Sequence, residues 1–400
     1  MSTQTTRAAY PFNVVDPFVL PVEFDTLRAD DPVPLVRVAT GDEVWLVTTY
    51  DDVRAVLNDR RFSRNVFRPD AARLIPGVPV GQLSTPFVDP PAHTRWRKLM
   101  ARAFTPRYVE GLRANVQTIV DRLVDDIAAQ AVPVDLVRAF AYPLPIATIC
   151  ELFGIKVEEH EPFASLADRA LTVGHATMDE RVAAFDDMAR FAADLVATKR
   201  ARPGDDLLSR LIAVHDEDEG RLTEKELAAT ILTLLIGGYE STVNQIGKAM
   251  LALFRHPEQL TALRAEPSLI GTAVEETLRY AALDSGYGSP RYATEDVPVG
   301  DVVIPRGSTV LVIRASANRD GTVFPDPDRF DITREPNPHV AFGAGPHVCL
   351  GAALARLELE LGISTLVRRF PELRLVTPVD EVAWDYRITV AGPVALPVTW

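Results

Sequence analysis

The spacing of apolar residues predicts a chain that is mostly helical. The longest periodic segment runs from Thr223 to Phe254, and Thr223 and Glu226 form a capping box, with threonine at the N-cap and glutamate at N3. A helix over this segment has to end before Pro257. At about 1.5 Å per residue it would be roughly 46 Å long, enough to cross the molecule.

The remaining pattern divides into shorter helices, short strands and loops. Helical spacing recurs in four further segments: 51–57, 89–200, 268–281 and 350–361. Short β-prone runs predict strands at 34–50, 297–299, 302–304, 309–313, 386–390 and 394–400. No βαβ alternation, linker or repeat interrupts the chain. The pattern therefore predicts one large domain over residues 1–400, mainly α with small β-sheets.

Composition narrows the class of protein. The chain has 400 residues, of which 47% are hydrophobic, enough for a large core. It has no signal-like N-terminus and no apolar run of about 18 residues, so we expect a soluble, cytoplasmic protein. Its net charge of −13 disfavours nucleic acid as a partner. Its two cysteines, Cys150 and Cys349, lie far apart and fit a reducing compartment, and the apolar run around Cys150 predicts a core residue.

One segment near the C-terminus combines a cysteine with glycines at a predicted helix start. Cys349 lies among Gly343, Gly345 and Gly351. Glycine permits positive φ and close backbone approach, so N–H groups can point at the sulfur. The helix dipole also stabilises a thiolate at this end. With Phe342 covering the sulfur, the segment predicts a buried thiolate that holds a haem iron.

Two further interpretations of Cys349 are weaker. A lone cysteine is usually a small buried apolar residue, but that role does not explain the surrounding glycines and aromatic. A zinc site would need more ligands than His347 and Cys349, and no other Cys or His pair has zinc spacing.

The predicted long helix contains an unfavourable pair of glycines. Gly237 and Gly238 each cost about 1 kcal/mol relative to alanine. Close helix packing is one explanation. The other is space beside a cofactor, because an acid and two alcohols follow: Glu240, Ser241 and Thr242. Activation of dioxygen needs such space and a proton donor at its edge, so these three residues are the predicted catalytic group.

Two sets of charged residues have candidate roles. Glu276 and Arg279 are i and i+3 on one helix face, and their apolar surroundings predict a buried structural pair with Arg329 as a third partner. Cationic residues could hold the haem carboxylates: His93, Arg97, Arg291 and His347. A basic stretch also predicts either a solvated helix face or a docking surface for an acidic electron donor: Arg95, Lys98, Arg102 and Arg107.

Together these motifs resemble the cytochrome P450 family, in its soluble bacterial form, over nearly the whole chain. The segment 342–351 is similar to the family's haem signature, and Glu276-x-x-Arg279 with 327–330 is similar to its Glu-x-x-Arg motif and meander. Residues 89–97 resemble the haem-contacting helix, and 237–242 the oxygen-activating helix. Residues 317–320 and 337–339 also fit the bacterial pattern.

The oxygen-activating segment departs from the family pattern at two positions. Ser241 stands where threonine usually follows the acid, which keeps the hydroxyl but loses the methyl that restrains its rotamer. Thr242 points about 100° further round the helix. Tyr239 replaces a common histidine, which we expect to reshape the pocket.

The resemblance implies a mostly α cytochrome P450 fold and a haem b cofactor held by the Cys349 thiolate. It also implies dioxygen, an external ferredoxin and reductase with NAD(P)H, and a monomer that docks neither membrane nor nucleic acid. The implied cofactor-binding set is His93, Arg97, Gly238, Arg291, Phe342, His347, Cys349 and Gly351. The implied substrate contacts are Thr233, Ile236, Gly237, Tyr287, Ile388 and Thr389.

The expected activity is therefore that of a haem-thiolate monooxygenase. The resemblance favours hydroxylation of a bulky natural product with a macrolide, polyketide or peptide scaffold. Epoxidation or oxidative coupling of the same scaffolds stays open, because the same oxidant performs them. A peroxide-driven enzyme and a haem sensor without turnover stay open as well, and the acid–alcohol pair argues against the first of these two.

Overall fold

The computed structural model describes residues 7–14, 16–66, 68–74, 89–156, 162–163, 165–166, 169, 178–216, 223–283, 288–385 and 390–400. The chain forms two compact units, and each is built from two separate stretches of sequence. The first unit combines 1–89 with 275–350, and the second combines 90–274 with 351–400. Because both units are discontinuous, no linker in the sequence marks the division, and the single domain over 1–400 stays a prediction.

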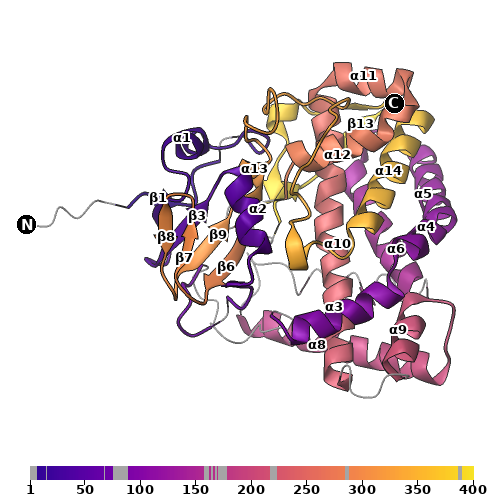
Figure 1. The fold of residues 1–400 in the computed structure, drawn as a ribbon. Coiled ribbons are helices and arrows are strands. Elements are labelled where there is room, and N and C mark those ends of the chain that lie inside the picture. Colours follow the sequence, from indigo (N-terminus) through magenta and orange to yellow (C-terminus); the bar gives the residue numbers. More distant parts are fainter. Residues whose placement is uncertain are drawn as a thin grey trace, which may run out of the picture. The chain divides into compact units, whose positions relative to one another are not determined.

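The first unit is built on a six-stranded sheet with the order β1-β2-β3-β9-β6-β4 (Figure 1). Its strands are β1 (Ala9–Tyr10), β2 (Leu35–Val38), β3 (Glu43–Val47), β4 (Phe62–Ser63), β6 (Ser289–Ala293) and β9 (Thr309–Val312). β3 and β9 are parallel, whereas β9 and β6 are antiparallel. A separate hairpin joins β7 (Val297–Val299) to β8 (Val302–Ile304).

Successive residues of the central strands face opposite sides of this sheet. Val47 packs in a core cluster with α2 (Tyr50–Asn58), whereas its neighbour Leu46 packs in another with Phe24 of α1 (Glu23–Asp30). A strand that is buried on both faces reads as a continuous apolar run, which is why residues 44–47 and 309–313 lack a polar alternation.

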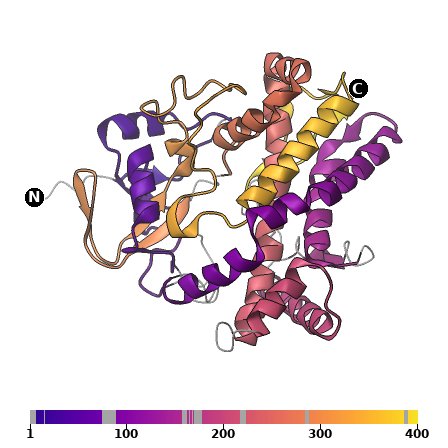
Figure 2. The same cartoon turned by 45° about the vertical axis from the view of Figure 1, so that its right-hand side comes forward.

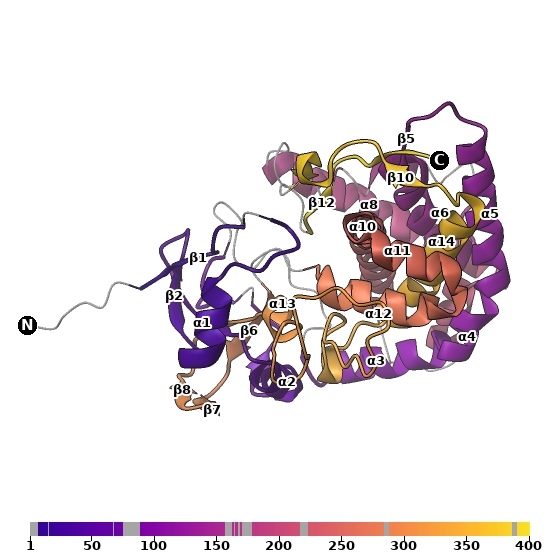
Figure 3. The same ribbon diagram turned by 90° about the horizontal axis from the view of Figure 1, so that it is seen from above.

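The second unit is helical, and α10 (Glu224–Arg255) contacts most of its other long helices. Figure 3 looks nearly along α10 and shows α6, α8 and α14 around it, and Figure 2 shows α14 alongside α5. The helices are α3 (Ala92–Ala103), α4 (Pro106–Gly111), α5 (Arg113–Ala128), α6 (Pro143–Phe153), α8 (Met178–Ala201), α9 (Leu207–Asp216), α11 (Pro257–Ala265) and α14 (Ala352–Arg369). α12 (Ile270–Tyr280) runs from this unit into the first.

Short elements complete the two units. The π-helix η1 (Val137–Ala141) precedes α6, and 3₁₀ turns lie at η3 (Pro267–Leu269), η4 (Gly345–His347) and η5 (Val379–Glu381). The four-residue helix α13 (Arg314–Ala317) follows β9. Short strands of the second unit are β5 (Val134–Asp135), β10 (Arg374–Leu375), β11 (Trp384–Asp385), β12 (Gly392–Pro393) and β13 (Pro397–Thr399).

The mainly helical fold with small sheets is confirmed, and so is the start of the long helix. Thr223 is the N-cap of α10, and the capping box with Glu226 is present. The predicted strand 394–400 is shorter in the structure, because only β13 (Pro397–Thr399) pairs with β10 and β5. Of the predicted strand 386–390, residues 386–389 lie outside the described part of the chain. In the described part of the chain, no helix has the length and apolar character needed to cross a membrane.

Candidate active site

The cysteine loop lies in the first unit and leads to α14. Cys349 follows η4 and precedes Gly351, the N-cap of α14. The Cys349 N–H donates to the carbonyl oxygen of Phe342 at 2.9 Å, which closes the loop. Cys349 is exposed, and its burial as an iron-bound thiolate stays a prediction. An exposed thiol held at a turn is one to which a metal can bind.

Two glycines fix the path of this loop. Gly343 and Gly345 have φ of +75° and +69°, a conformation that strains other residues. At Gly345 a Cβ would also lie 2.7 Å from the carbonyl oxygen of Leu57 and 3.0 Å from Cα of Asn58, at the end of α2. The loop can therefore approach the α2 backbone closely only because residue 345 has no side chain.

The first unit also contains two of the predicted cationic cofactor residues. Arg291, on β6, is only 4% exposed, and its Nη1 donates to the carbonyl oxygen of Pro290 at 2.9 Å. Burial, together with the nearby charges of Arg64 and Arg314, lowers the pKa of Arg291 to about 9. His347 is half-buried at the end of η4. A buried cation and a thiol loop in the same unit fit an anionic cofactor with a metal.

In the second unit, the two glycines of α10 differ in their surroundings. A Cβ at Gly238 would lie 2.5 Å from Cδ1 of Ile149 on α6, so a side chain here would have to displace the end of the Ile149 side chain. A Cβ at Gly237 would meet nothing within 4 Å. The packing explanation thus applies to Gly238, and the explanation from open space applies to Gly237.

Tyr239 belongs to the packing side of α10 as well. Its side chain is 3% exposed, and its ring meets that of Tyr142 edge-on with a centroid separation of 5.5 Å. The sequence led us to expect that Tyr239 reshapes a substrate pocket. This contact instead gives the ring a packing role against the chain between η1 and α6.

The predicted catalytic group occupies consecutive positions of α10 with different exposure. Glu240 is half-buried, and its Oε1 accepts a hydrogen bond from the Val390 N–H at 3.2 Å. The Ser241 hydroxyl donates to the carbonyl oxygen of Gly237 at 2.9 Å, and the residue is partly accessible. Thr242 is buried at 5% exposure. Of the two hydroxyl side chains, that of Ser241 is the more accessible, and it is bonded to Gly237.

The ion pair of α12 is fully buried in the first unit. Two bonds of 2.8 Å join the Arg279 guanidinium to the Glu276 carboxylate, and both side chains are 0% exposed. Arg279 also donates to the carbonyl oxygens of Asn318, Pro327 and Arg329. Such a bidentate, fully hydrogen-bonded pair can tolerate burial.

The prediction that the Arg329 side chain is the third partner of this pair is wrong. Arg329 contributes only its carbonyl oxygen, while its guanidinium lies 3.5 Å from Asp331 and is 63% exposed. Arg334 takes the predicted place, with Nε 3.3 Å from the Glu276 carboxylate, and Asn337 Nδ2 donates to it at 3.1 Å. Sequence spacing could not distinguish two arginines five positions apart in an irregular segment.

The remaining predicted cationic residues lie on α3 and α4 of the second unit. His93 is 4% exposed with its ring 6.0 Å from that of Trp96, and Arg97 is half-buried. The predicted docking residues are all exposed: Arg95, Lys98, Arg102 and Arg107. Arg95 is also within 2.5 Å of Glu226, so part of its charge is neutralised within the chain.

The predicted substrate contacts are only partly described. The Thr233 hydroxyl donates to the carbonyl oxygen of Ala229 at 2.7 Å within α10, one turn before Gly237. The Ile236 backbone belongs to α10, but its side chain lies outside the described part of the structure. Three further predicted contacts lie outside the described residues altogether: Tyr287, Ile388 and Thr389.

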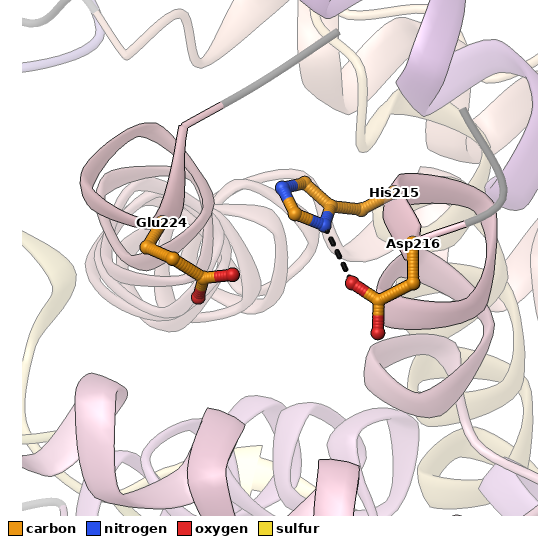
Figure 4. Close-up of side chains that lie close together, drawn as sticks. All are labelled: His215, Asp216 and Glu224. Atoms are coloured by element: carbon orange, nitrogen blue, oxygen red, sulfur yellow. Dashed lines mark hydrogen bonds and ion pairs between the residues drawn. The ribbon is translucent and has the colours of Figure 1, made fainter. Parts of the chain in front are cut away.

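Another group of possible metal ligands lies in the second unit, and no motif in the sequence predicts it. His215 Nδ1 is 2.8 Å from Asp216 Oδ1, and Glu224 lies close by (Figure 4). Arg200 pairs with both carboxylates at 2.9 Å. Because the guanidinium already supplies the balancing charge, we assign no metal to this group.

Comparison with known proteins identifies the same family that the motifs resemble. A family model for cytochrome P450 matches residues 164–383. Nocardicin C N-oxygenase of Nocardia uniformis subsp. tsuyamanensis is 44% identical over all of both chains. Mycinamicin IV hydroxylase/epoxidase of Micromonospora griseorubida is 41% identical, again over all of both chains.

Solved structures resemble the chain to the same degree. The LnmA cytochrome P450 hydroxylase from the leinamycin biosynthetic pathway of Streptomyces atroolivaceus superposes with a TM-score of 0.91 and 41% identity. The match covers 98% of this chain and 100% of that one. The two relatives are at least 41% identical to this chain over its full length, so the similarity covers both units. The chain belongs to the cytochrome P450 family.

Proposed function

We propose that the chain is a haem-thiolate monooxygenase that hydroxylates a bulky natural product. The single observation that carries this proposal is the Cys349 loop, with its exposed thiol and two glycines at positive φ, in a chain of the P450 family. As a member of that family, the protein uses a haem-thiolate centre, dioxygen and electrons supplied from outside. When bound, the haem supplies the oxidising chemistry, in which one oxygen atom enters the substrate and the other leaves as water.

The residues present fit haem b. Cys349 offers the thiolate ligand, and the buried Arg291 guanidinium offers a partner for a haem carboxylate. His93, Arg97 and His347 stay predicted partners of the carboxylates, and Phe342, Gly351 and Gly238 stay predicted neighbours of the ring. Cationic groups of this kind suit an anionic macrocycle, because a charge-assisted hydrogen bond is about twice as strong as a neutral one.

Glu240 and Ser241 are the proposed proton donors. Glu240 is half-buried and bonded to a backbone N–H, which keeps its carboxylate at a defined position. Ser241 orients its hydroxyl through the Gly237 carbonyl, beside the open position in α10. A positioned acid followed by a hydroxyl can move a proton from solvent towards the reacting oxygen. The buried Thr242 is better placed to support packing than to donate.

Electrons would come from NAD(P)H through an external reductase and ferredoxin. The four exposed basic residues on α3 and α4 offer a surface for an acidic protein: Arg95, Lys98, Arg102 and Arg107. We propose that the enzyme works as a monomer in the cytoplasm. Activity driven by peroxide alone, at a rate equal to that with a ferredoxin system, would instead favour a peroxide-driven enzyme.

The relatives suggest the class of substrate. One is named for N-oxygenation of nocardicin C, and another for hydroxylation and epoxidation of mycinamicin IV. A substrate of comparable bulk, with a macrolide, polyketide or peptide scaffold, is the preferred one here. Epoxidation and oxidative coupling are the second choice of reaction on the same scaffolds.

A spectral titration tests this substrate class directly. The purified holoprotein is titrated with mycinamicin IV, nocardicin C and small camphor-sized controls, and the high-spin shift of the haem band is recorded. We expect a saturable shift with at least one bulky scaffold and none with the small controls. A shift produced only by the small compounds would contradict the proposed class.

A further inference from the structure

Three arginines of the first unit come together beside the cysteine loop. β4 and β6 pair with Phe62 opposite Ala293 and Ser63 opposite Tyr292, and the next step of this register brings Arg64 to Arg291. Arg314 is the first residue of α13, directly after the strand that pairs with β6 on its other edge. Sheet pairing therefore brings Arg64 to Arg291, and Arg314 lies near enough for its charge to lower the pKa of both. We call these three residues the arginine cluster.

The hydrogen bonds of the arginine cluster do not balance its charge. Arg291 donates to the carbonyl oxygen of Pro290, and Arg314 Nη1 donates to that of Ala341 at 2.8 Å, directly before the cysteine loop. The Nε of Arg314 is buried and has no acceptor among the described residues. A buried guanidinium N–H without an acceptor costs about 1–3 kcal/mol, so a missing acceptor is expected here.

Electrostatics supports the same conclusion. Burial and the charge of Arg314 lower the pKa of Arg64, and the charges of Arg64 and Arg314 add to the effect of burial on the pKa of Arg291. Asp89 is the carboxylate that partly offsets both shifts. It accepts hydrogen bonds from the Ser63 hydroxyl and the Arg64 N–H. The charge of Cys349, the proposed iron ligand, also offsets the shift of Arg64. Apart from that ligand, three positive charges face one carboxylate, a surplus that suits a dianion.

We propose that the arginine cluster binds the two carboxylates of the haem, and that Arg64 and Arg314 act with Arg291 as their partners. This inference rests on the proposed cofactor. It adds two residues that neither motif spacing nor the haem signature predicts. Arg314 would also connect the carboxylates to the cysteine loop, because its other donor group holds the Ala341 carbonyl.

A carboxylate of an acidic substrate has the same chemistry, so the experiment has to separate the two sources. Apoprotein is reconstituted with protohaem or with its dimethyl ester, which lacks both charges, and transfer of each to excess apomyoglobin is timed. The variants are Arg314→Gln, Arg314→Lys and, as a matched control, Arg306→Gln, which changes an exposed arginine of the same unit. Thermal unfolding of each variant checks the fold.

We expect Arg314→Gln to lose protohaem about tenfold faster than the wild type, the effect of one charge-assisted contact. The same variant should release the dimethyl ester at the wild-type rate, and Arg314→Lys should fall between. Equal acceleration for both haems would show a purely structural role and overturn the inference. An unchanged rate of protohaem loss in Arg314→Gln would also overturn the inference. If that variant instead weakens only the binding of a carboxylate probe such as benzoate, the arginine cluster binds an acidic substrate and not the haem.

The proposed function fails in a different way. It fails if wild-type protein reconstituted with protohaem lacks the thiolate band of the ferrous carbonyl spectrum. In the case where that band is present and the Arg314→Gln rate is unchanged, only the role of the arginine cluster is rejected.

Discussion

At the residue scale, Glu358 of the second unit has an unusual environment for a carboxyl group. It lies on α14 at 2% exposure, and its Oε1 has no hydrogen-bond partner among the described residues. Burial raises the pKa of Glu358 to about 8, and the nearby Thr148 hydroxyl only partly offsets this. An acid with so high a pKa is neutral in the folded protein near pH 7.

Glu358 should therefore make folding stability depend on pH. Its pKa is about 8 when folded and near the ordinary 4.5 when unfolded, so its contribution is complete below pH 4.5 and is lost as pH rises to 8. The loss is about 1.4 kcal/mol per pH unit in that window. Urea unfolding at pH 5, 6.5 and 8 measures this effect. The free energy of unfolding of Glu358→Gln should rise relative to that of the wild type as pH rises.

Glu360 provides the control for this titration. It lies two positions further along α14, but its carboxylate pairs with Arg113 at 3.0 Å and is 35% exposed. Glu360→Gln makes the same chemical change at a half-exposed, salt-bridged position, so it is measured beside Glu358→Gln at each pH. A Glu358→Gln difference from the wild type that stays constant from pH 5 to 8 would show that Glu358 is ionised in the folded state.

The buried ion pair of α12 allows a comparison of two arginines. Arg334→Ala removes a partner of the fully buried Glu276 carboxylate, so we expect it to lower the free energy of unfolding by about 2–4 kcal/mol. Arg329→Ala removes an exposed guanidinium and should cost less than about 1 kcal/mol. Denaturant unfolding measures both, and equal losses would contradict the assignment of Arg334.

Glu240 has two possible roles that two substitutions separate. Glu240→Ala removes both the acid and the acceptor of the Val390 N–H, and turnover should slow at least about tenfold. Glu240→Gln keeps an acceptor oxygen but cannot give up a proton, so it should be slowed as much. The rate of product formation per enzyme is the measurement. Normal turnover in Glu240→Gln would mean that the residue only anchors the backbone near Val390.

At the scale of elements, the two glycines of α10 should respond in opposite ways to alanine. Gly237→Ala gains helix propensity of about 1 kcal/mol without a contact within 4 Å, so the apoprotein should become more stable. Gly238→Ala gains the same propensity but has to displace Cδ1 of Ile149, and an overpacking cost of about 1–3 kcal/mol should outweigh that gain. Thermal or urea unfolding of both variants measures whether each substitution raises or lowers the free energy of unfolding.

A second substitution in α6 tests the cause of the Gly238 effect. Ile149→Val removes the Cδ1 atom that the new Cβ would meet, so it should recover most of the stability lost in Gly238→Ala. Additive losses in the double variant would show that the contact between α10 and α6 does not explain why residue 238 is glycine.

At the scale of the whole molecule, local signals predicted the elements better than their grouping. The capping box at Thr223 and Glu226 defined the start of α10, because a cap is a contact between residues close in sequence. The division into two discontinuous units depends on contacts between distant stretches, which periodicity does not report. For the same reason the sequence predicted a strand over 394–400, where pairing gives the shorter β13.

The site was predictable to the extent that its chemistry lies in short motifs. The loop around Cys349, with glycines at positive φ, follows from the sequence alone. Arg334 and Arg314 were missed because their partners come from irregular segments or from neighbouring strands. Gly238 and Gly237 looked alike in sequence, and only the position of Ile149 separates packing from open space.

The ferrous carbonyl spectrum tests the central claim most directly. Protein expressed with ample haem precursor is reduced and exposed to carbon monoxide, both as wild type and as Cys349→Ser. The account predicts the long-wavelength band typical of thiolate ligation for the wild type and its loss in the variant, because serine cannot replace the sulfur ligand. A thiolate band that persists in Cys349→Ser, or a wild type that binds no haem, would contradict it.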